Sequence, residues 1–311
     1  MVPSSLQKKL YCLECENSSL NFNELDSEIE CLSCNTKYPL NNGIPSMMKG
    51  GPDEQDWNPW DLDRLKMIGD SYYKRSVGEL PEKESSKSYA NLLNKKCIYK
   101  KGESYLDIGC ATGHFLKSFR RIVDEDFNYT GIDATPHYLQ WGAEIFGLSD
   151  NCSFVHCDTL NLPFKDKSFD NVIVNLFHFF PRVDEALKEV FRVCRGRVIW
   201  RTPIGEINYM CKMIYNDSFQ ELGVLTPERN DFDHSVYMIY SKPYIKDLIE
   251  SLGAEVEFIE RDEDFEAFDN TSLEEMRHFT STKTVGGMQV NGNLILDWQY
   301  ISIDCRNYKG Q

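Results

Sequence analysis

The sequence predicts an α/β fold, in which helices cover both faces of a mostly parallel sheet, with a small metal-binding module at the N-terminus. Three observations predict it. Short apolar stretches alternate with amphipathic ones after residue 100, as strands alternate with helices in a parallel sheet. Two Cys-x-x-Cys pairs precede them. The 311 residues are 41% hydrophobic and 27% charged, a composition typical of a chain that folds around a core.

The N-terminal cysteines are spaced as the ligands of one metal ion. Cys12 and Cys15 form one Cys-x-x-Cys pair, and Cys31 and Cys34 form the second. Two tight turns that each present two thiolates can close a tetrahedral sulfur site, which is typical of a zinc ribbon. Because sulfur would fill every position, we expect a structural Zn2+ that stabilises a small module. Four unrelated core cysteines are the alternative interpretation.

The expected organisation has three segments: a zinc-ribbon module at 1–50, a linker with helices at 51–100, and the main domain at 101–311. Residues 49–56 are rich in glycine and polar side chains, as a domain boundary is. Trp57 and Trp60 follow and could anchor the linker to the main domain. From about Asp61 to Lys100, apolar residues recur at helical spacing in a polar background.

In the main domain, strands are predicted from short apolar runs and helices from apolar residues three and four positions apart. The expected strands are Ser104–Ile108, Tyr129–Ile132, Ser153–Cys157, Asp170–Val174, Arg197–Trp200, Glu255–Ile259 and Leu294–Ile303. The expected helices are Thr112–Val123, Pro136–Phe146, Val183–Cys194 and Lys242–Leu252, the last ended by Gly253. This alternation requires right-handed crossovers and hence parallel strands.

An acidic residue follows or ends each of the first three strands. These residues are Asp107, Asp133 and Asp158, and a turn between Gly109 and Gly113 follows the first strand. Ligands of such sheets bind at the carboxyl ends of the strands, where a carboxylate can accept both hydroxyls of a ribose. Three acids would repel the phosphates of a dinucleotide but suit a cationic nucleoside. That description fits S-adenosylmethionine.

The motifs Tyr-Leu-Asp-Ile-Gly-Cys-Ala-Thr-Gly-His-Phe, Gly-Ile-Asp and Cys-Asp-Thr-Leu-Asn-Leu-Pro-Phe, in this order, resemble the class I S-adenosylmethionine-dependent methyltransferases. The resemblance covers roughly residues 85–260. It implies a Rossmann-like sheet of seven strands, the last of them antiparallel. The N-terminal cysteine pairs, followed by Tyr-Pro-x-x-x-Gly-Ile-Pro-x-Met, resemble the zinc-ribbon modules that accompany many methyltransferases.

The resemblance also implies which residues hold the cofactor. The methionine part would contact Asp107, Gly109, Cys110 and Gly113, the ribose Asp133, and the adenine Asp158 with Thr159. Ala111, Ala134 and Asn175 complete the expected cofactor-binding set. Ala111 stands where the family's loop has its middle glycine, a departure that we expect to matter little.

Methyl transfer from a sulfonium needs the acceptor held in line in a dry pocket, and a base where the acceptor must lose a proton. The segment after the fourth strand lines this site in the family. His178 is the first candidate for the base, with simple aromatic packing as the alternative, and Asn175 could position the acceptor. Arg201 and His234 face the same end but favour structural roles. Tyr72 and Tyr73 could close over the cofactor or only pack.

The insert at 204–232 is expected to select the substrate. Tyr209, Met210, Met213, Tyr215 and Phe219 predict a helix by their spacing, either covering the acceptor or packing in the core. The leading functional interpretation is methyl transfer to an O or N atom of a small molecule, sugar or lipid-linked glycan. A tRNA or rRNA methyltransferase is one alternative, and a non-catalytic protein that binds a partner through the ribbon is another.

The net charge and the apolar runs indicate which partners and which cellular location to expect. Lys and Arg number 34 against 49 Asp and Glu, so the net charge is −15, which disfavours nucleic acid. No apolar run is long enough to span a membrane, and the N-terminus lacks the apolar core of a signal peptide. We therefore expect a cytoplasmic protein.

Overall fold

The computed structural model of the chain describes residues 1–23, 25, 27–49, 62–214, 218–229, 234–262, 282–285, 288–291 and 294–310. For residues 62–66, 282–285, 288–291 and 294–296 it describes the backbone. Trp57, Trp60 and residues 50–56 of the expected domain boundary lie outside the described residues, as does Tyr215 of the insert. Within the described residues, no helix is both long and apolar enough to cross a bilayer.

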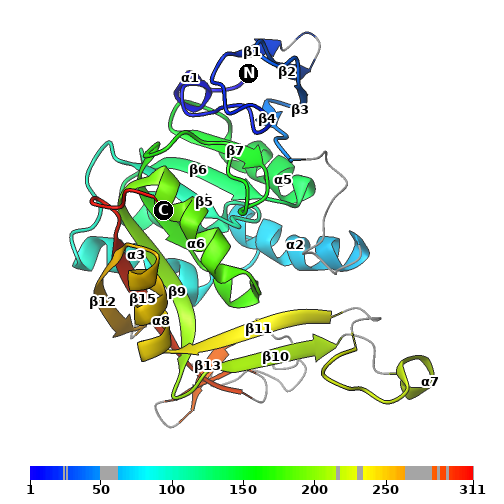
Figure 1. Cartoon of the computed structure of the whole chain (residues 1–311), viewed down its shortest axis with the longest axis vertical. Helices are drawn as coiled ribbons and strands as arrows, with labels where there is room; N and C mark the ends of the chain where they lie inside the picture. The colour runs from blue at the N-terminus through cyan, green and yellow to red at the C-terminus, as the bar shows by residue number, and fades with distance from the viewer. Residues whose placement is uncertain are drawn as a thin grey trace.

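The main domain is built on a sheet that follows the predicted alternation of strands and helices (Figure 1). The parallel strands lie side by side in the order β7 (Cys152–His156), β6 (Asn128–Asp133), β5 (Ser104–Ile108), β8 (Phe169–Val174) and β9 (Cys194–Gly205). Next to β9 lies the antiparallel β15 (Leu294–Asp304), and β12 (Glu255–Arg261) pairs with β15. These seven strands confirm the expected Rossmann-like sheet.

Four further strands extend this sheet to eleven. They are β10 (Tyr209–Ile214), β11 (His234–Ser241), β13 (Thr282–Val285) and β14 (Met288–Asn291). The β10–β11 hairpin projects from one end of the sheet in Figure 1, where the last residues of β11 pair with the end of β9. β13 and β14 form a second antiparallel pair beside the start of β15.

The helix expected in the insert is therefore wrong over Tyr209–Ile214. These residues form β10 and pair along their whole length with β11, from Tyr209 opposite Ile239 to Ile214 opposite His234. The spacing of the apolar residues fits a helix, but the ladder of backbone hydrogen bonds to a strand more than twenty residues later decides the conformation. Of the expected set, Phe219 is helical, in the short α7 (Phe219–Leu222).

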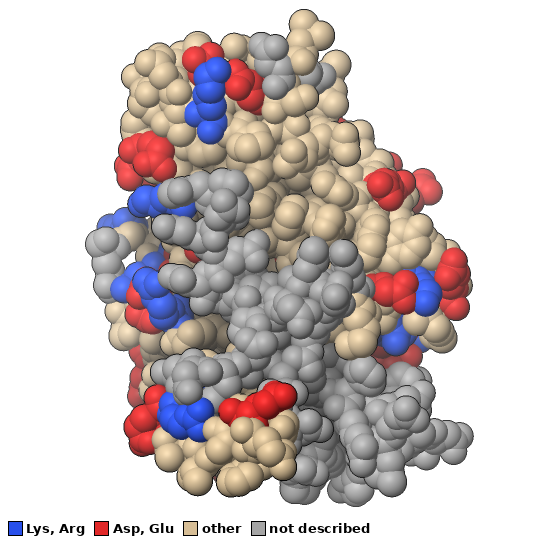
Figure 2. Space-filling view, turned by 90° about the vertical axis from the view of Figure 1, so that its right-hand side faces the viewer, with Lys and Arg blue, Asp and Glu red and all other residues tan. Residues whose placement is uncertain are grey.

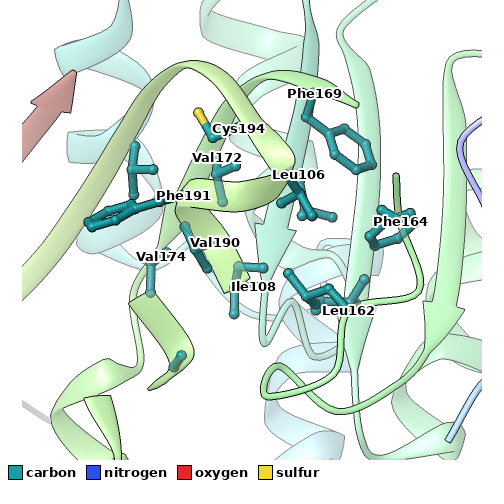
Figure 3. Close-up of a cluster of buried hydrophobic side chains, with 14 of the residues drawn as sticks. Leu106, Ile108, Leu162, Phe164, Phe169, Val172, Val174, Val190, Phe191 and Cys194 are labelled. Atoms are coloured by element: carbon teal, nitrogen blue, oxygen red, sulfur yellow. The ribbon is translucent and has the colours of Figure 1, made fainter. Parts of the chain in front are cut away.

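Helices cover both faces of the sheet, because neighbouring residues of each strand point to opposite sides. On one side lie α2 (Leu62–Val77), α3 (Glu84–Lys95), α4 (His114–Ile122) and α5 (Pro136–Phe146), and on the other α6 (Val183–Val193) and α8 (Lys242–Ser251). Leu106 and Ile108 of β5 join the core beneath α6, shown in Figure 3, whereas Tyr105 joins the core beneath α3 and α4.

The N-terminal module forms its own antiparallel sheet and caps the β7 edge of the large one (Figure 1). Its elements are α1 (Ser4–Gln7), β1 (Leu20–Asn23), β2 (Glu28–Cys31), β3 (Lys37–Asn41) and β4 (Ile44–Pro45). Leu10 bridges Phe164, and Ser46 bridges His156 at the end of β7. Most buried apolar side chains of the module belong to one core cluster with the main domain, and Ile44 belongs to the other. The cap covers a sheet edge that would otherwise present unpaired backbone groups.

Candidate active site and metal centre

The turn from β5 into α4 has the conformation that its glycines predict. Gly109 has φ of +67°, and a Cβ there would lie 1.8 Å from Leu176, in the segment after β8. Gly113, with φ of +70°, caps the N-terminus of α4. Ala111 also has a positive φ, 49°, in the left-handed region that disfavours a side chain. The alanine therefore carries a cost in backbone conformation, while the small effect expected on cofactor binding stays a prediction.

Asp107 is buried under this turn. Its side chain is 2% exposed, and its Oδ2 accepts a hydrogen bond of 2.7 Å from the hydroxyl of Tyr129 on β6. Burial, and to a smaller extent the charge of Asp133, raises the pKa of Asp107 from 3.8 to about 7. A carboxyl held in this way would become an anion readily beside a cationic ligand, which suits the role expected of it.

Asp133 ends β6 and ties two loops together. Its Oδ2 accepts a hydrogen bond of 2.9 Å from the amide of Ala111, and its Oδ1 accepts one of 2.8 Å from the amide of Thr135. Burial raises the pKa of Asp133, while these amides oppose the shift. Each carboxylate oxygen keeps a second lone pair, so a ribose can still donate to both.

The third acid lies beyond β7. Asp158 is half-buried, and its Oδ1 accepts a hydrogen bond of 2.9 Å from the amide of Leu160, which closes a tight turn. Thr159 beside it is buried. In the parallel register, Asp107 lies opposite Gly131, and Asp133 lies opposite His156, two residues before Asp158. The three acids therefore lie together at the carboxyl ends of the parallel strands.

Helix α2 lies over the glycine turn. Tyr72 packs against Ala111 and Tyr138 and stacks on His114 at a ring distance of 4.6 Å. Ser76 hydrogen-bonds the hydroxyl of Thr112 over 3.2 Å. Tyr73, in contrast, lies against Trp141, with ring centroids 5.5 Å apart. Of the two expected lid residues, Tyr72 is the one in contact with the turn.

Asn175, at the carboxyl end of β8, belongs to a buried polar network. Its Oδ1 accepts a hydrogen bond of 3.2 Å from Arg201, whose Nε lies 2.8 Å from Oδ2 of Asp262. Arg201 and Asp262 are 2% and 3% exposed. Ser88 on α3 donates to the other oxygen of Asp262. Arg201 therefore takes part in a structural ion pair that orients Asn175.

His178 lies in a one-turn helix, η1 (Phe177–Phe179), among aromatic rings. It contacts Phe179, Tyr237 and Trp298 at ring distances of 4.2, 4.9 and 5.1 Å. Burial, followed by the charge of Arg201, lowers the pKa of His178 to about 3. Its Nδ1 is buried and has no hydrogen-bond partner among the described residues. A neutral imidazole of this kind is a weak proton acceptor but a good hydrogen-bond acceptor.

His234 begins β11 opposite Ile214, at the outer end of the hairpin. The opposite end of β11, at Tyr240 and Ser241, is the part that pairs with β9. The register therefore separates His234 from the strand ends that carry the acids and Asn175.

The four N-terminal cysteines meet as their spacing predicts. Their sulfur atoms all lie within 4.8 Å of one another. Both pairs adopt the same turn. The amide of Glu16 donates to the carbonyl oxygen of Cys12, and the amide of Asn35 donates to that of Cys31. Glu16 and Asn35 both have a positive φ. Tyr38 contacts Cys12 Sγ over 3.2 Å from the core side. Two equivalent turns around four thiols fit a tetrahedral zinc ion.

Several residues that shape the site were not predicted. Tyr129 partners Asp107, Asp262 partners Arg201, and His156 lies between the module and the Asp133 turn. Tyr129 could have been found, since it lies two residues before the glycine opposite Asp107 and its side chain shares that face. Asp262 could not, because it lies in an acidic stretch with no feature to distinguish it.

Comparisons with known proteins agree with this geometry. Residues 106–196 match a family described as methyltransferase domain. Demethylmenaquinone methyltransferase of Staphylococcus aureus strain JH9 is 33% identical over 113 residues, which cover 36% of this chain and 47% of that protein. The chain thus spans about half the length of the curated relatives it matches. A candidate sarcosine dimethylglycine methyltransferase from Galdieria sulphuraria superposes with a TM-score of 0.50 at 16% identity, covering 76% of this chain and 98% of that one.

The matched residues run from β5 to β9 and include the glycine turn and all three strand-end acids. Residues 106–196 are therefore similar in sequence to a methyltransferase domain, and they lie in the Rossmann-like sheet described above.

Proposed function

We propose that this protein transfers the methyl group of S-adenosylmethionine to an oxygen or nitrogen atom of a small molecule, a sugar or a lipid-linked glycan. The observation that carries the proposal is that Asp107, Asp133 and Asp158 lie at the carboxyl ends of three adjacent parallel strands, around a glycine turn. When bound, S-adenosylmethionine supplies a methyl group carried on a positively charged sulfur.

On the cofactor side, each acid has a distinct task. Asp107 supplies negative charge from beneath the turn, where burial makes an ion pair stronger than in water. Asp133 accepts the two ribose hydroxyls with the lone pairs that Ala111 and Thr135 leave open. Asp158 and Thr159 face the adenine, while Tyr72 covers the turn and helps to exclude water.

On the acceptor side, Asn175 and His178 are the residues that we assign. Arg201 occupies the amide oxygen of Asn175, so the amide N–H groups are the part that can donate to an acceptor. Nδ1 of His178 accepts a hydrogen bond from the acceptor hydroxyl or amine and orients it toward the methyl group. Its low pKa favours this orienting role over that of a general base.

The similarity to a demethylmenaquinone methyltransferase supports a small-molecule acceptor. Two of the four lysines of the N-terminal module are engaged within the molecule, which counts against RNA binding. Lys9 packs over Phe169 at 4.1 Å, where burial lowers its pKa to about 8, and Lys37 pairs with Glu28 at 2.8 Å. Figure 2 shows the basic side chains of one face in small separate groups, mostly beside acidic ones. Phosphate binding needs a continuous basic surface instead.

For the N-terminal module we propose a structural zinc ion held by Cys12, Cys15, Cys31 and Cys34. The ion would replace the repulsion between four close sulfur atoms by four bonds, and would hold together a module with a small core. Cys12 and Cys31 are buried, whereas Cys15 and Cys34 reach the surface, so the ion would lie near the outer end of the module.

Titration calorimetry of the full chain with S-adenosylhomocysteine tests the cofactor assignment. We expect one site per chain with a Kd in the micromolar range, on the order of −8 kcal/mol. A screen of acceptors with radiolabelled S-adenosylmethionine then tests the transfer. Absence of any binding heat would contradict the proposal, and transfer to RNA but to no small molecule would correct the acceptor class.

A further inference from the structure

The N-terminal module contacts the main domain next to the strand ends that carry the residues assigned to the cofactor. Ser46, directly after β4, forms a parallel bridge with His156, the last residue of β7. The amide of Met47 donates a hydrogen bond of 2.8 Å to the carbonyl of His156. Both residues belong to the Gly-Ile-Pro-Ser-Met motif that follows the second cysteine pair. The motif therefore adds a short backbone pairing beside the end of β7 to the large sheet.

The ring of His156 forms hydrogen bonds both to the N-terminal module and to the turn after β6. It is 4% exposed, with Nδ1 2.7 Å from the hydroxyl of Ser46 and Nε2 3.1 Å from the carbonyl oxygen of Ala134. A carbonyl only accepts, so Nε2 carries the proton. In the neutral ring Nδ1 then accepts from Ser46. Burial lowers the pKa of His156, which favours this neutral form.

Ala134 belongs to the turn that presents Asp133. The carboxylate of Asp133 holds the amides of Thr135 and Ala111, and the carbonyl of Asp133 accepts a hydrogen bond of 3.3 Å from the amide of Cys157. A shift of the Ala134 carbonyl would therefore move the carboxylate assigned to the ribose.

We propose that His156 is a positioning residue that couples the cysteine module to the cofactor-binding turn through Ser46 and Ala134. The metal-bound module holds Ser46 in place, Ser46 fixes the ring of His156, and the ring fixes the turn that carries Asp133. Loss of the metal should then weaken cofactor affinity without removing any residue that contacts the cofactor. This inference rests on the proposed function.

The two ring contacts can be separated by substitution. In His156→Gln, the amide group reaches the place of Nε2 and can still donate to Ala134. In His156→Asn, the shorter amide reaches the place of Nδ1 and can still meet Ser46. We expect His156→Asn to raise the Kd for S-adenosylhomocysteine at least fivefold in the metal-loaded protein, and His156→Gln, which loses the contact with Ser46, to raise it at least threefold. Ser5→Ala, which removes a 2.8 Å hydrogen bond to Asp150 across the same interface, is the matched control and should leave the Kd unchanged.

The deciding measurement combines these variants with removal of the metal from the full chain. Chelation should raise the Kd of the wild-type protein and of Ser5→Ala at least threefold, but should add little in His156→Asn, since the coupling is already broken. Equal losses on chelation in all three proteins would overturn the inference while leaving the proposed function intact. Failure of the metal-loaded wild-type protein to bind would overturn both. If His156→Asn does not fold, as judged by circular dichroism, Ser46→Ala takes its place: its Kd should rise at least threefold, as in His156→Gln, and chelation should add little.

Discussion

Asp107→Asn should make the protein more stable and a poorer cofactor binder. The buried carboxyl has a pKa of about 7, against 3.8 for an ordinary aspartate. The difference of about 3 pH units corresponds to roughly 4 kcal/mol at most that ionisation of Asp107 takes from the folded state. Asparagine has the same shape, stays neutral and can still accept the hydrogen bond from Tyr129. The aspartate is therefore retained at a cost in stability.

The sign of the pH dependence follows from linkage. Because the folded pKa is raised, the folded state retains a proton that the unfolded state has lost, and stability falls as pH rises from about 4 to about 7. The gain from Asp107→Asn should thus be about 2 kcal/mol larger at pH 8 than at pH 5.5, measured by urea unfolding at both values. Affinity for S-adenosylhomocysteine should fall at least tenfold. Asp126→Asn, at an exposed position, is the control. A variant that is less stable at pH 8, or whose gain does not change with pH, would refute the reasoning.

Four more outcomes are expected. Asp133→Ala should weaken cofactor binding at least tenfold and lower the melting temperature, since the amides of Ala111 and Thr135 lose their acceptor; a normal Kd by calorimetry would contradict the ribose assignment. Ala111→Gly should raise the free energy of unfolding by up to about 1 kcal/mol, because glycine accepts the positive φ, and a loss of stability would count against this. His178→Ala should lower kcat at least tenfold, whereas His178→Asn should retain most of it, and the wild-type rate should show no limb from His178 between pH 5 and 8. Metal analysis should find one zinc per chain in the wild-type protein and none in Cys12→Ser.

The arrangement of the sheet could be predicted because its signals are local. The helix Pro136–Phe146 has the predicted limits, and the predicted strands of the sheet agree with the structure to within a few residues, except that β9 extends to Gly205. Apolar runs bounded by glycine or polar residues leave few alternatives in a parallel sheet. The acids at the strand ends were predictable for the same reason, since each lies within two residues of the end of a strand.

Contacts between distant parts of the chain could not be predicted in this way. Asp262 lies 61 residues from Arg201, and His156 lies 110 residues from Ser46, so no spacing rule relates them. The helix predicted for the insert was wrong for a related reason. β10 is a strand because β11 pairs with it, although the spacing of its apolar residues favours a helix. The hydrogen bond between the Ala111 amide and the Asp133 carboxylate likewise joins residues 22 positions apart.

The central claim is that the adenosyl part of the cofactor lies against Asp133 at the common edge of the strands. A crystal structure of the zinc-loaded full chain with S-adenosylhomocysteine tests it most directly. The account predicts both ribose hydroxyls within hydrogen-bonding distance of the Asp133 carboxylate and the amino-acid part over the glycine turn above Asp107. Density for the ligand at any other place, with this edge unchanged, would contradict it.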